Sequence, residues 1–233
     1  VVLPLVRWLK RETDLGVSVC LGSLRKELYD DLKAAGASIY ILKFETADPA
    51  HYRAMEAPGT LESRIENIRY LARTGWAVSS GFIAGLPDQT PDRLLANFRL
   101  ASELPLEGCS VSPFVPGDET PLASASASGV DLALNCMASL RLMRPDLVIP
   151  AVSALNLAEP GAGYRRGLAT GANLVTINLT PEDVRENYLL YKRDRIIMTE
   201  ERILRALEAE KLEVAELGLG RFLRERRAQL AAA

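Results

Sequence analysis

The sequence predicts an α/β fold in the form of a partial TIM-type barrel, with about six of the eight strand–helix units of a closed (βα)8 barrel. Three observations predict it. Short apolar runs alternate with segments of helical spacing along the 233 residues. No long all-β stretch interrupts this alternation, which favours parallel strands joined by right-handed crossovers. Polar residues end one predicted strand after another, as at the mouth of a barrel, whereas an open doubly wound sheet concentrates its site at one switch point.

The predicted strands are apolar or alternating runs, as expected for strands covered by helices. They begin near Val17, Ser38, Trp76, Gly108, Leu147 and Asn173. Their predicted carboxyl ends carry Glu45-Thr46, Ser79-Ser80, Ser110 with Ser112, Ser153 with Asn156, and Asn178.

The predicted helices follow the strands and carry recognisable start and stop signals. Thr90-Pro91 is typical of a helix start, and Gly36 and Gly75 stand where glycine commonly follows a helix end. Pro121–Gly129 is small and polar and predicts a loop. The expected helices are Pro4–Thr13, Arg25–Ala35, Leu61–Arg73, Pro91–Glu103, Val130–Met143 and a charged helix from Thr199 that leads to a basic, solvated tail.

Composition narrows the class of protein. The 28 basic and 30 acidic residues give a net charge of −2, which argues against nucleic acid as a partner. No apolar run reaches the roughly 18–20 residues of a membrane span, and no signal peptide is apparent, so we expect no membrane partner and a cytoplasmic protein. Three dispersed cysteines predict reduced thiols and no metal framework. Because the chain opens with Val1 and runs directly into a helix, we expect it to be part of something longer.

The segment around Lys43 and Glu45 is the strongest local candidate for chemistry. In a strand these two residues share a face with Ile39 and Ile41, which places Glu45 at the tip. A carboxylate there can accept hydrogen bonds from ribose hydroxyls or a ligand amine. The alternatives are a purely structural ion pair and, for Lys43, a Schiff base with a carbonyl substrate.

Two further features border the predicted strand tips. Arg64 lies in the first turn of a helix, where the dipole disfavours a cation, so it is either a carboxylate clamp or a surface arginine paired with an acid. Gly81 and Gly85 lie within a strand, which suggests either close approach of a ligand or tight packing.

Other signals are weaker. Gly161 and Gly163 nearly match a dinucleotide-binding fingerprint, with the wrong spacing. His51, the single histidine, is expected to be solvated in a polar loop, and a zinc site or a Cys–His dyad is not expected.

Taken in order, these motifs resemble the biotin-synthase-like group of the radical S-adenosylmethionine (SAM) enzymes. Within that group the chain is most similar to the radical SAM maturase of iron-only hydrogenase and to methylornithine synthase. The resemblance covers nearly all of residues 10–195. The motifs are Phe44-Glu45-Thr46-Ala47, Glu62-Ser63-Arg64, the run from Gly81 to Thr90, Ser112–Pro116 with Thr120–Leu122, Ile149–Ala151 and Asn178–Pro181.

The resemblance implies roles for particular residues. Glu45 would contact the ribose or amino group of SAM, Arg64 would hold the methionyl carboxylate, and the strand end at Ala84 and Gly85 would pass beside the adenine. The residues expected at the substrate are Ser18, Cys20, Lys43 and Ser153. No catalytic residue is assigned.

The resemblance also implies an activity. Such enzymes reductively cleave SAM to a 5′-deoxyadenosyl radical that abstracts hydrogen from a small substrate, with a ferredoxin or flavodoxin as electron donor. The C-x-x-x-C-x-x-C loop that ligates their 4Fe–4S cluster is absent here, so its ligands are expected upstream and the chain alone is expected to be inactive.

Two alternatives remain open. One is a barrel without a cluster that binds SAM or a nucleoside, and the other is the Lys43 Schiff-base lyase. The expected organisation is a barrel part over residues 1–198, with a region associated with biotin and thiamin synthesis at roughly 110–195, and a C-terminal helix and tail over 199–233.

Overall fold

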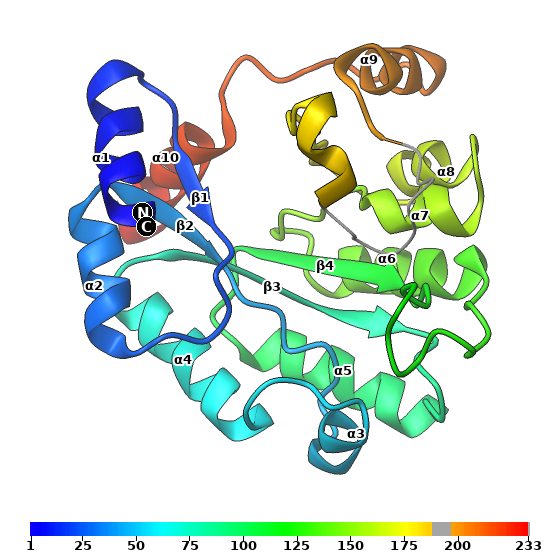
Figure 1. Cartoon of the computed structure of the whole chain (residues 1–233). Helices are drawn as coiled ribbons and strands as arrows, with labels where there is room; N and C mark the ends of the chain where they lie inside the picture. The colour runs from blue at the N-terminus through cyan, green and yellow to red at the C-terminus, as the bar shows by residue number, and fades with distance from the viewer. Residues whose placement is uncertain (188–196, 233) are drawn as a thin grey trace. The chain divides into compact units, whose positions relative to one another are not determined.

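The computed structural model describes residues 1–187 and 197–232. Its strands are β1 (Val17–Val19), β2 (Ala37–Ile41), β3 (Ala77–Ala84) and β4 (Gly108–Pro113). They form one sheet in sequence order, and the β1–β2 and β2–β3 pairs are parallel. Helices separate successive strands, which confirms the α/β alternation (Figure 1).

Helices account for most of the remaining described chain. Among these residues no helix combines the length and apolar composition needed to cross a membrane. The helices are α1 (Val2–Glu12), α2 (Lys26–Ala34), α3 (Pro49–Ala54), α4 (Leu61–Arg73), α5 (Pro91–Glu103), α6 (Val130–Met143), α7 (Ser153–Ala158), α8 (Gly163–Ala169), the 3-10 helix η1 (Glu182–Asn187), α9 (Glu200–Ala209) and α10 (Leu219–Ala232).

The chain divides into two compact units. Unit 1 comprises Val1–Gly81, Arg99–Gly108 and Ala215–Ala233, and unit 2 comprises Phe82–Phe98 and Cys109–Val214. The organisation predicted from sequence, with a boundary near residue 198, stays a prediction. Residues 188–195 of its biotin- and thiamin-associated region lie outside the described residues.

Unit 1 is built around an aromatic cluster between β2 and its flanking elements. Tyr40 of β2 makes edge-to-face contacts with Tyr29 of α2, at 4.9 Å between ring centroids, and with Trp76, at 5.4 Å. All three side chains are fully buried. This packing holds α2 against β2, as Figure 1 shows, and leaves Ile39 and Ile41 on the opposite face of the strand.

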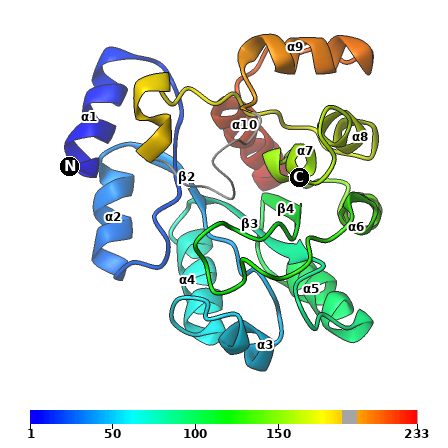
Figure 2. The same ribbon diagram turned by 45° about the vertical axis from the view of Figure 1, so that its right-hand side comes forward.

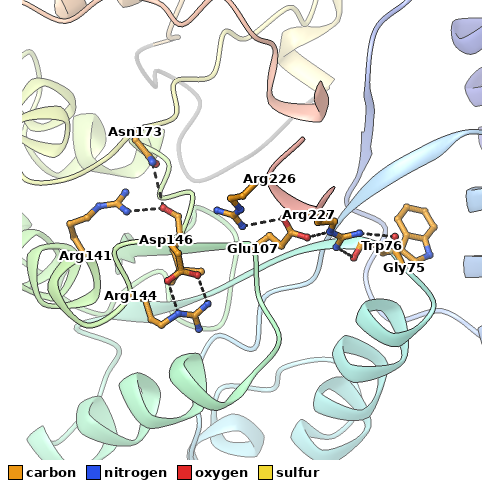
Figure 3. A network of polar contacts seen from close by, with 10 residues as sticks. Gly75, Trp76, Glu107, Arg141, Arg144, Asp146, Asn173, Arg226 and Arg227 are labelled. Atoms are coloured by element: carbon orange, nitrogen blue, oxygen red, sulfur yellow. Dashed lines mark hydrogen bonds and ion pairs between the residues drawn. The ribbon is translucent and has the colours of Figure 1, made fainter. Parts of the chain in front are cut away.

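The basic tail was expected to be a solvated terminal helix. It forms the helix α10, whose described residues are mostly exposed, and it also packs on unit 1. Leu223 is buried, and Arg226 and Arg227 both pair with Glu107, which precedes β4 (Figure 3). Arg227 also donates to the carbonyls of Gly75 and Trp76, just before β3. The helix therefore covers the amino-terminal ends of β3 and β4, where its arginines make charge-assisted hydrogen bonds.

Unit 2 has an apolar core of its own. It gathers α8, α9 and their neighbours around seven buried side chains, and α7 lies beside α8 (Figure 2). These are Ala151, Tyr164, Leu168, Met198, Ile203, Ala206 and Leu207.

The strands expected near Leu147 and Asn173 are reduced to one parallel bridge, between Pro150 and Leu174. Pro150 has no N–H to donate, which limits a ladder through this segment. The segments still pair in the predicted order, since Cys109 N–H donates to Val148 and Ala151 N–H donates to Leu174. Arg141 of α6 donates to the carbonyls of Leu147 and Gly171, which lie at the turns before the two segments.

Candidate functional site

The carboxyl end of β2 carries the first part of the candidate site. Tyr40, Leu42 and Phe44 are buried, whereas Lys43 and Glu45 are partly exposed on the other face, as the strand alternation predicts. The Lys43 Nζ lies 3.0 Å from Glu45 Oε2. This oxygen is buried and accepts no hydrogen bond from the described residues. Glu45 therefore has acceptor capacity that a ligand hydroxyl or amine could use.

The backbone at Glu45 is bent by a bulge. The N–H groups of Phe44 and Glu45 both donate to the carbonyl of Gly81, at 3.1 and 3.0 Å. Glu45 takes φ = 60°, a conformation that costs an ordinary residue about 1–2 kcal/mol. Strain of this kind persists where surrounding contacts enforce it, and it is common at functional sites.

Cys20 lies close to these charges. Ser18 and Cys20 are both exposed, at and just beyond β1. Desolvation by neighbouring groups raises the pKa of the Cys20 thiol, and the positive charges of Lys43 and Arg64 oppose that rise. Cys20, Lys43, Glu45 and Arg64 therefore form one electrostatic cluster in unit 1, although the sequence predicts separate substrate and cofactor roles for its members.

Arg64 is buried, at 8% exposure, and is not the surface arginine of the alternative interpretation. Its Nε donates to the Tyr52 hydroxyl at 2.7 Å, Nη1 donates to the Lys43 carbonyl at 3.1 Å, and Nη2 donates to the Pro58 carbonyl at 3.4 Å. A guanidinium carries five N–H groups, so these bonds leave one on each terminal nitrogen. Two N–H groups on the terminal nitrogens are among the donors with which arginine binds a carboxylate.

The expectation for His51 is wrong, because the residue is 1% exposed. It lies in α3, and its Nδ1 is 3.2 Å from Thr46 Oγ1. Its backbone N–H is capped by Asp48. The pair Asp48-Pro49 is a good helix start that could have predicted α3. Burial of the ring brings Thr46, next to Glu45, into the same packed loop.

Ala84 and Gly85 lie in unit 2, where protein groups already engage their backbone. The Ala84 carbonyl accepts from Phe114 N–H at 2.9 Å and from Ser128 Oγ at 3.1 Å. The Gly85 N–H donates to Gln89 Oε1 at 2.7 Å. Ala84 is fully buried and Gly85 is partly exposed, so their expected contact with adenine stays a prediction. Neither Ser128 nor Gln89 was a candidate from sequence.

Ser153, the last predicted substrate residue, is exposed at the first turn of α7 in unit 2. No contact that the structure describes supports a substrate-binding role for Ser153, and this role stays a prediction.

The cysteines do not fit an iron–sulfur cluster. Cys20 is exposed, while Cys109 and Cys136 are buried, and all three are free thiols. Among residues 1–187 and 197–232, no three His, Cys, Asp or Glu side chains are grouped to hold a metal. A 4Fe–4S cluster of the C-x-x-x-C-x-x-C type needs three thiolates from one loop. This chain does not supply them.

Comparison with known proteins finds similar sequences in one enzyme superfamily. Residues 4–101 match the radical SAM superfamily. The chain is 33% identical over 191 residues to the FeFe-hydrogenase maturase subunit HydE of Thermotoga maritima, covering 82% of the chain and 54% of that protein. It is 29% identical over 169 residues to biotin synthase 1 of Corynebacterium diphtheriae, covering 72% and 48%.

The fold is similar as well. The crystal structure of methylornithine synthase matches 92% of this chain and 63% of its own with a TM-score of 0.75, at 24% identity. The chain spans about half the length of the two curated relatives described above. The partial barrel expected from sequence is confirmed by this similarity together with the parallel strands. The chain belongs to the radical SAM superfamily, in its biotin-synthase-like group.

Proposed function

We propose that this chain binds SAM and forms the SAM-holding part of an enzyme that reductively cleaves SAM to abstract hydrogen from a small substrate. The observation that carries the proposal is the presence, in one unit, of two groups. Arg64 is buried and keeps two N–H groups beyond its three hydrogen bonds, and Glu45 has a buried oxygen that pairs with Lys43 but accepts no hydrogen bond from the described residues. Membership in the radical SAM superfamily supports it.

Each residue would make one kind of contact. Arg64 would donate its two remaining N–H groups to the α-carboxylate of SAM. Glu45 would accept from the ammonium or the ribose hydroxyls, with Lys43 Nζ 3.0 Å from its Oε2. For Ala84 and Gly85, a contact with the adenine is implied by the family resemblance and stays a prediction. Bound SAM supplies the chemistry of the family, and the protein binds, orients and excludes water.

The remaining components are also proposals. The cluster ligands would come from polypeptide outside these 233 residues, because the cysteines of this chain do not fit the cluster. The substrate would be a small molecule beside Ser18, Cys20 and Lys43, and a contact with Ser153 stays a prediction from the family resemblance. We further propose a cytoplasmic enzyme that takes its electron from a ferredoxin or flavodoxin.

Equilibrium dialysis of the purified chain against SAM tests the proposal. Arg64→Gln removes the guanidinium, and we expect SAM affinity to fall by about 10- to 100-fold, the effect of about 1.4–3 kcal/mol for a charge-assisted contact. Arg69→Gln, an exposed arginine on the same helix, is the matched control and should bind as the unaltered chain does. Equal binding by Arg64→Gln and the unaltered chain would contradict the proposal.

A second candidate function is a barrel that binds SAM or a nucleoside without catalysis. The scattered cysteines favour it. The coding sequence upstream of Val1 separates the two functions. A C-x-x-x-C-x-x-C motif there supports the radical enzyme, and an open reading frame without it supports the binding protein.

The Lys43 lyase gains no support from the described contacts. A Schiff base needs an amine that can attack a carbonyl, whereas Lys43 Nζ is held in an ion pair with Glu45.

A further inference from the structure

The loop between β2 and α4 contains the short helix α3, which carries a tyrosine that contacts Arg64. Asp48 caps α3, whose first turn begins with Pro49. Tyr52 follows on the same short helix and is fully buried. Its ring lies 5.9 Å from the Arg64 guanidinium carbon. The loop therefore brings an aromatic hydroxyl to a cation that comes from a different helix.

The hydrogen bonds of this hydroxyl have a defined direction. Tyr52 donates its single hydrogen to the Pro58 carbonyl at 3.0 Å. Its lone pairs then accept from Arg64 Nε, at 2.7 Å. The Pro58 carbonyl also accepts from Arg64 Nη2. Tyr52, Pro58 and Arg64 thus close a ring of hydrogen bonds in which every donor has one assigned acceptor.

This ring fixes the plane of the guanidinium. The Lys43 carbonyl holds Nη1, so three acceptors from three positions in the chain bind three N–H groups of one rigid planar group. The N–H groups that remain, one on each terminal nitrogen, can then lie in only one orientation. A carboxylate that meets this fork finds its donors already placed, and less side-chain entropy is lost on binding.

We infer that Tyr52 is a positioning residue, which acts through Arg64 to orient its two open N–H groups toward the carboxylate of the bound ligand. This inference rests on the proposed function, since it takes SAM as the ligand of Arg64. It also makes a specific statement that the proposed function does not. The hydroxyl of Tyr52 affects recognition of the carboxylate and leaves recognition of the rest of the ligand unchanged.

The test compares two ligands, SAM and decarboxylated S-adenosylmethionine, on the full chain. Tyr52→Phe keeps the ring and removes the hydroxyl. We expect SAM to bind about tenfold more weakly, as for the loss of one hydrogen bond to a charged group. Decarboxylated S-adenosylmethionine should bind within about twofold of its affinity for the unaltered chain, because it has no carboxylate for the fork to hold.

Tyr70→Phe is the matched control. It removes a tyrosine hydroxyl from α4, the helix that carries Arg64, where the hydroxyl donates to Asp30. Both ligands should bind this variant normally. If Tyr52→Phe does not fold by circular dichroism, Tyr52→4-aminophenylalanine is used. It keeps the donor to Pro58 and the volume of the side chain but accepts poorly from Arg64, and the same selective loss is expected.

The outcomes separate the two claims. Equal weakening of both ligands by the Tyr52 variants, or no weakening of SAM, overturns the inference while a loss in Arg64→Gln keeps the proposed function. If SAM does not bind the unaltered chain, or binds Arg64→Gln equally well, the proposed function fails and the inference fails with it.

Discussion

The most specific structural prediction concerns Gly85, because both its backbone conformation and its close neighbour Ser128 disfavour a side chain at this position. Its backbone has φ = 82°, and a Cβ at this position would lie 2.2 Å from Cβ and 2.8 Å from Oγ of Ser128. The serine cannot simply move away, since its Oγ donates to Ala84 and accepts from Phe114 N–H. Gly85→Ala should therefore strain the end of β3 and displace Ser128.

The two effects can be estimated separately. An alanine at positive φ costs about 1–2 kcal/mol. Carbon atoms in contact normally lie about 3.5–4.0 Å apart, and overpacking of a filled site costs about 1–3 kcal/mol. We expect Gly85→Ala to lower the free energy of unfolding by about 2–5 kcal/mol, the sum of both.

Gly161 provides a matched control for the backbone effect. It also has φ = 82° and lies in unit 2, but nothing lies within 4 Å of the point that a Cβ would occupy there. Gly161→Ala should cost only the backbone strain, about 1–2 kcal/mol. Urea denaturation followed by circular dichroism measures both variants.

A second substitution isolates the steric effect. In the Gly85→Ala background, Ser128→Gly removes the clashing atoms and should recover stability relative to the sum of the two single changes, whereas Ser128→Ala keeps the Cβ and should not. Equal costs for Gly85→Ala and Gly161→Ala, within about 0.5 kcal/mol, would refute the reasoning, since overpacking is expected to add more than that.

Three further outcomes are expected. Burial raises the pKa of the Cys136 thiol to about 11, so between about pH 9 and 11 the thiol ionises in the unfolded state but not in the folded state. The free energy of unfolding should therefore fall by about 1.4 kcal/mol per pH unit in this range. Urea titrations at several pH values should show this fall, and Cys136→Ala should lessen it. Iodoacetamide at pH 8 should modify Cys20 alone in the native chain and all three cysteines in urea, because Cys109 and Cys136 are buried; mass spectrometry counts the adducts. Glu107→Gln leaves two arginines of α10 without their carboxylate and should lower the free energy of unfolding by about 2–4 kcal/mol. Glu225→Gln breaks an exposed ion pair and should lower it by under about 0.5 kcal/mol. A smaller loss of stability for Glu107→Gln in thermal unfolding would show that these ion pairs do not hold α10 in place.

Local signals predicted the helices well. The bounds of α4, α5 and α6 are those expected from spacing and caps, and Thr60 caps α4 through the N–H of Ser63. Such signals act within a few residues, so the sequence carries them completely. The short helices α3, α7 and α8 were not predicted, because six or seven residues carry little periodicity. For α3 the pair Asp48-Pro49 was an available start signal.

The candidate site was predictable only in part. Strand alternation placed Lys43 and Glu45 on one face, and they form the ion pair that was one of the alternatives. The burial of His51 was not predictable, because its contact with Thr46 depends on how the loop folds back. Likewise Ser128 lay in a predicted loop with no signal that it would bridge Ala84 and Phe114.

Residue types and their local spacing were enough to predict the family, the strand–helix order and the chemical groups at the strand ends. Which of those groups remain available to a ligand depends on contacts between distant parts of the folded chain. The Gly81 carbonyl accepts hydrogen bonds from the N–H groups of both Phe44 and Glu45, where the chain bends. The Tyr52 hydroxyl and the carbonyls of Lys43 and Pro58 accept from three N–H groups of Arg64. A guanidinium or a carboxylate has a fixed number of donors or acceptors, and the folded chain decides how many of them its own groups use.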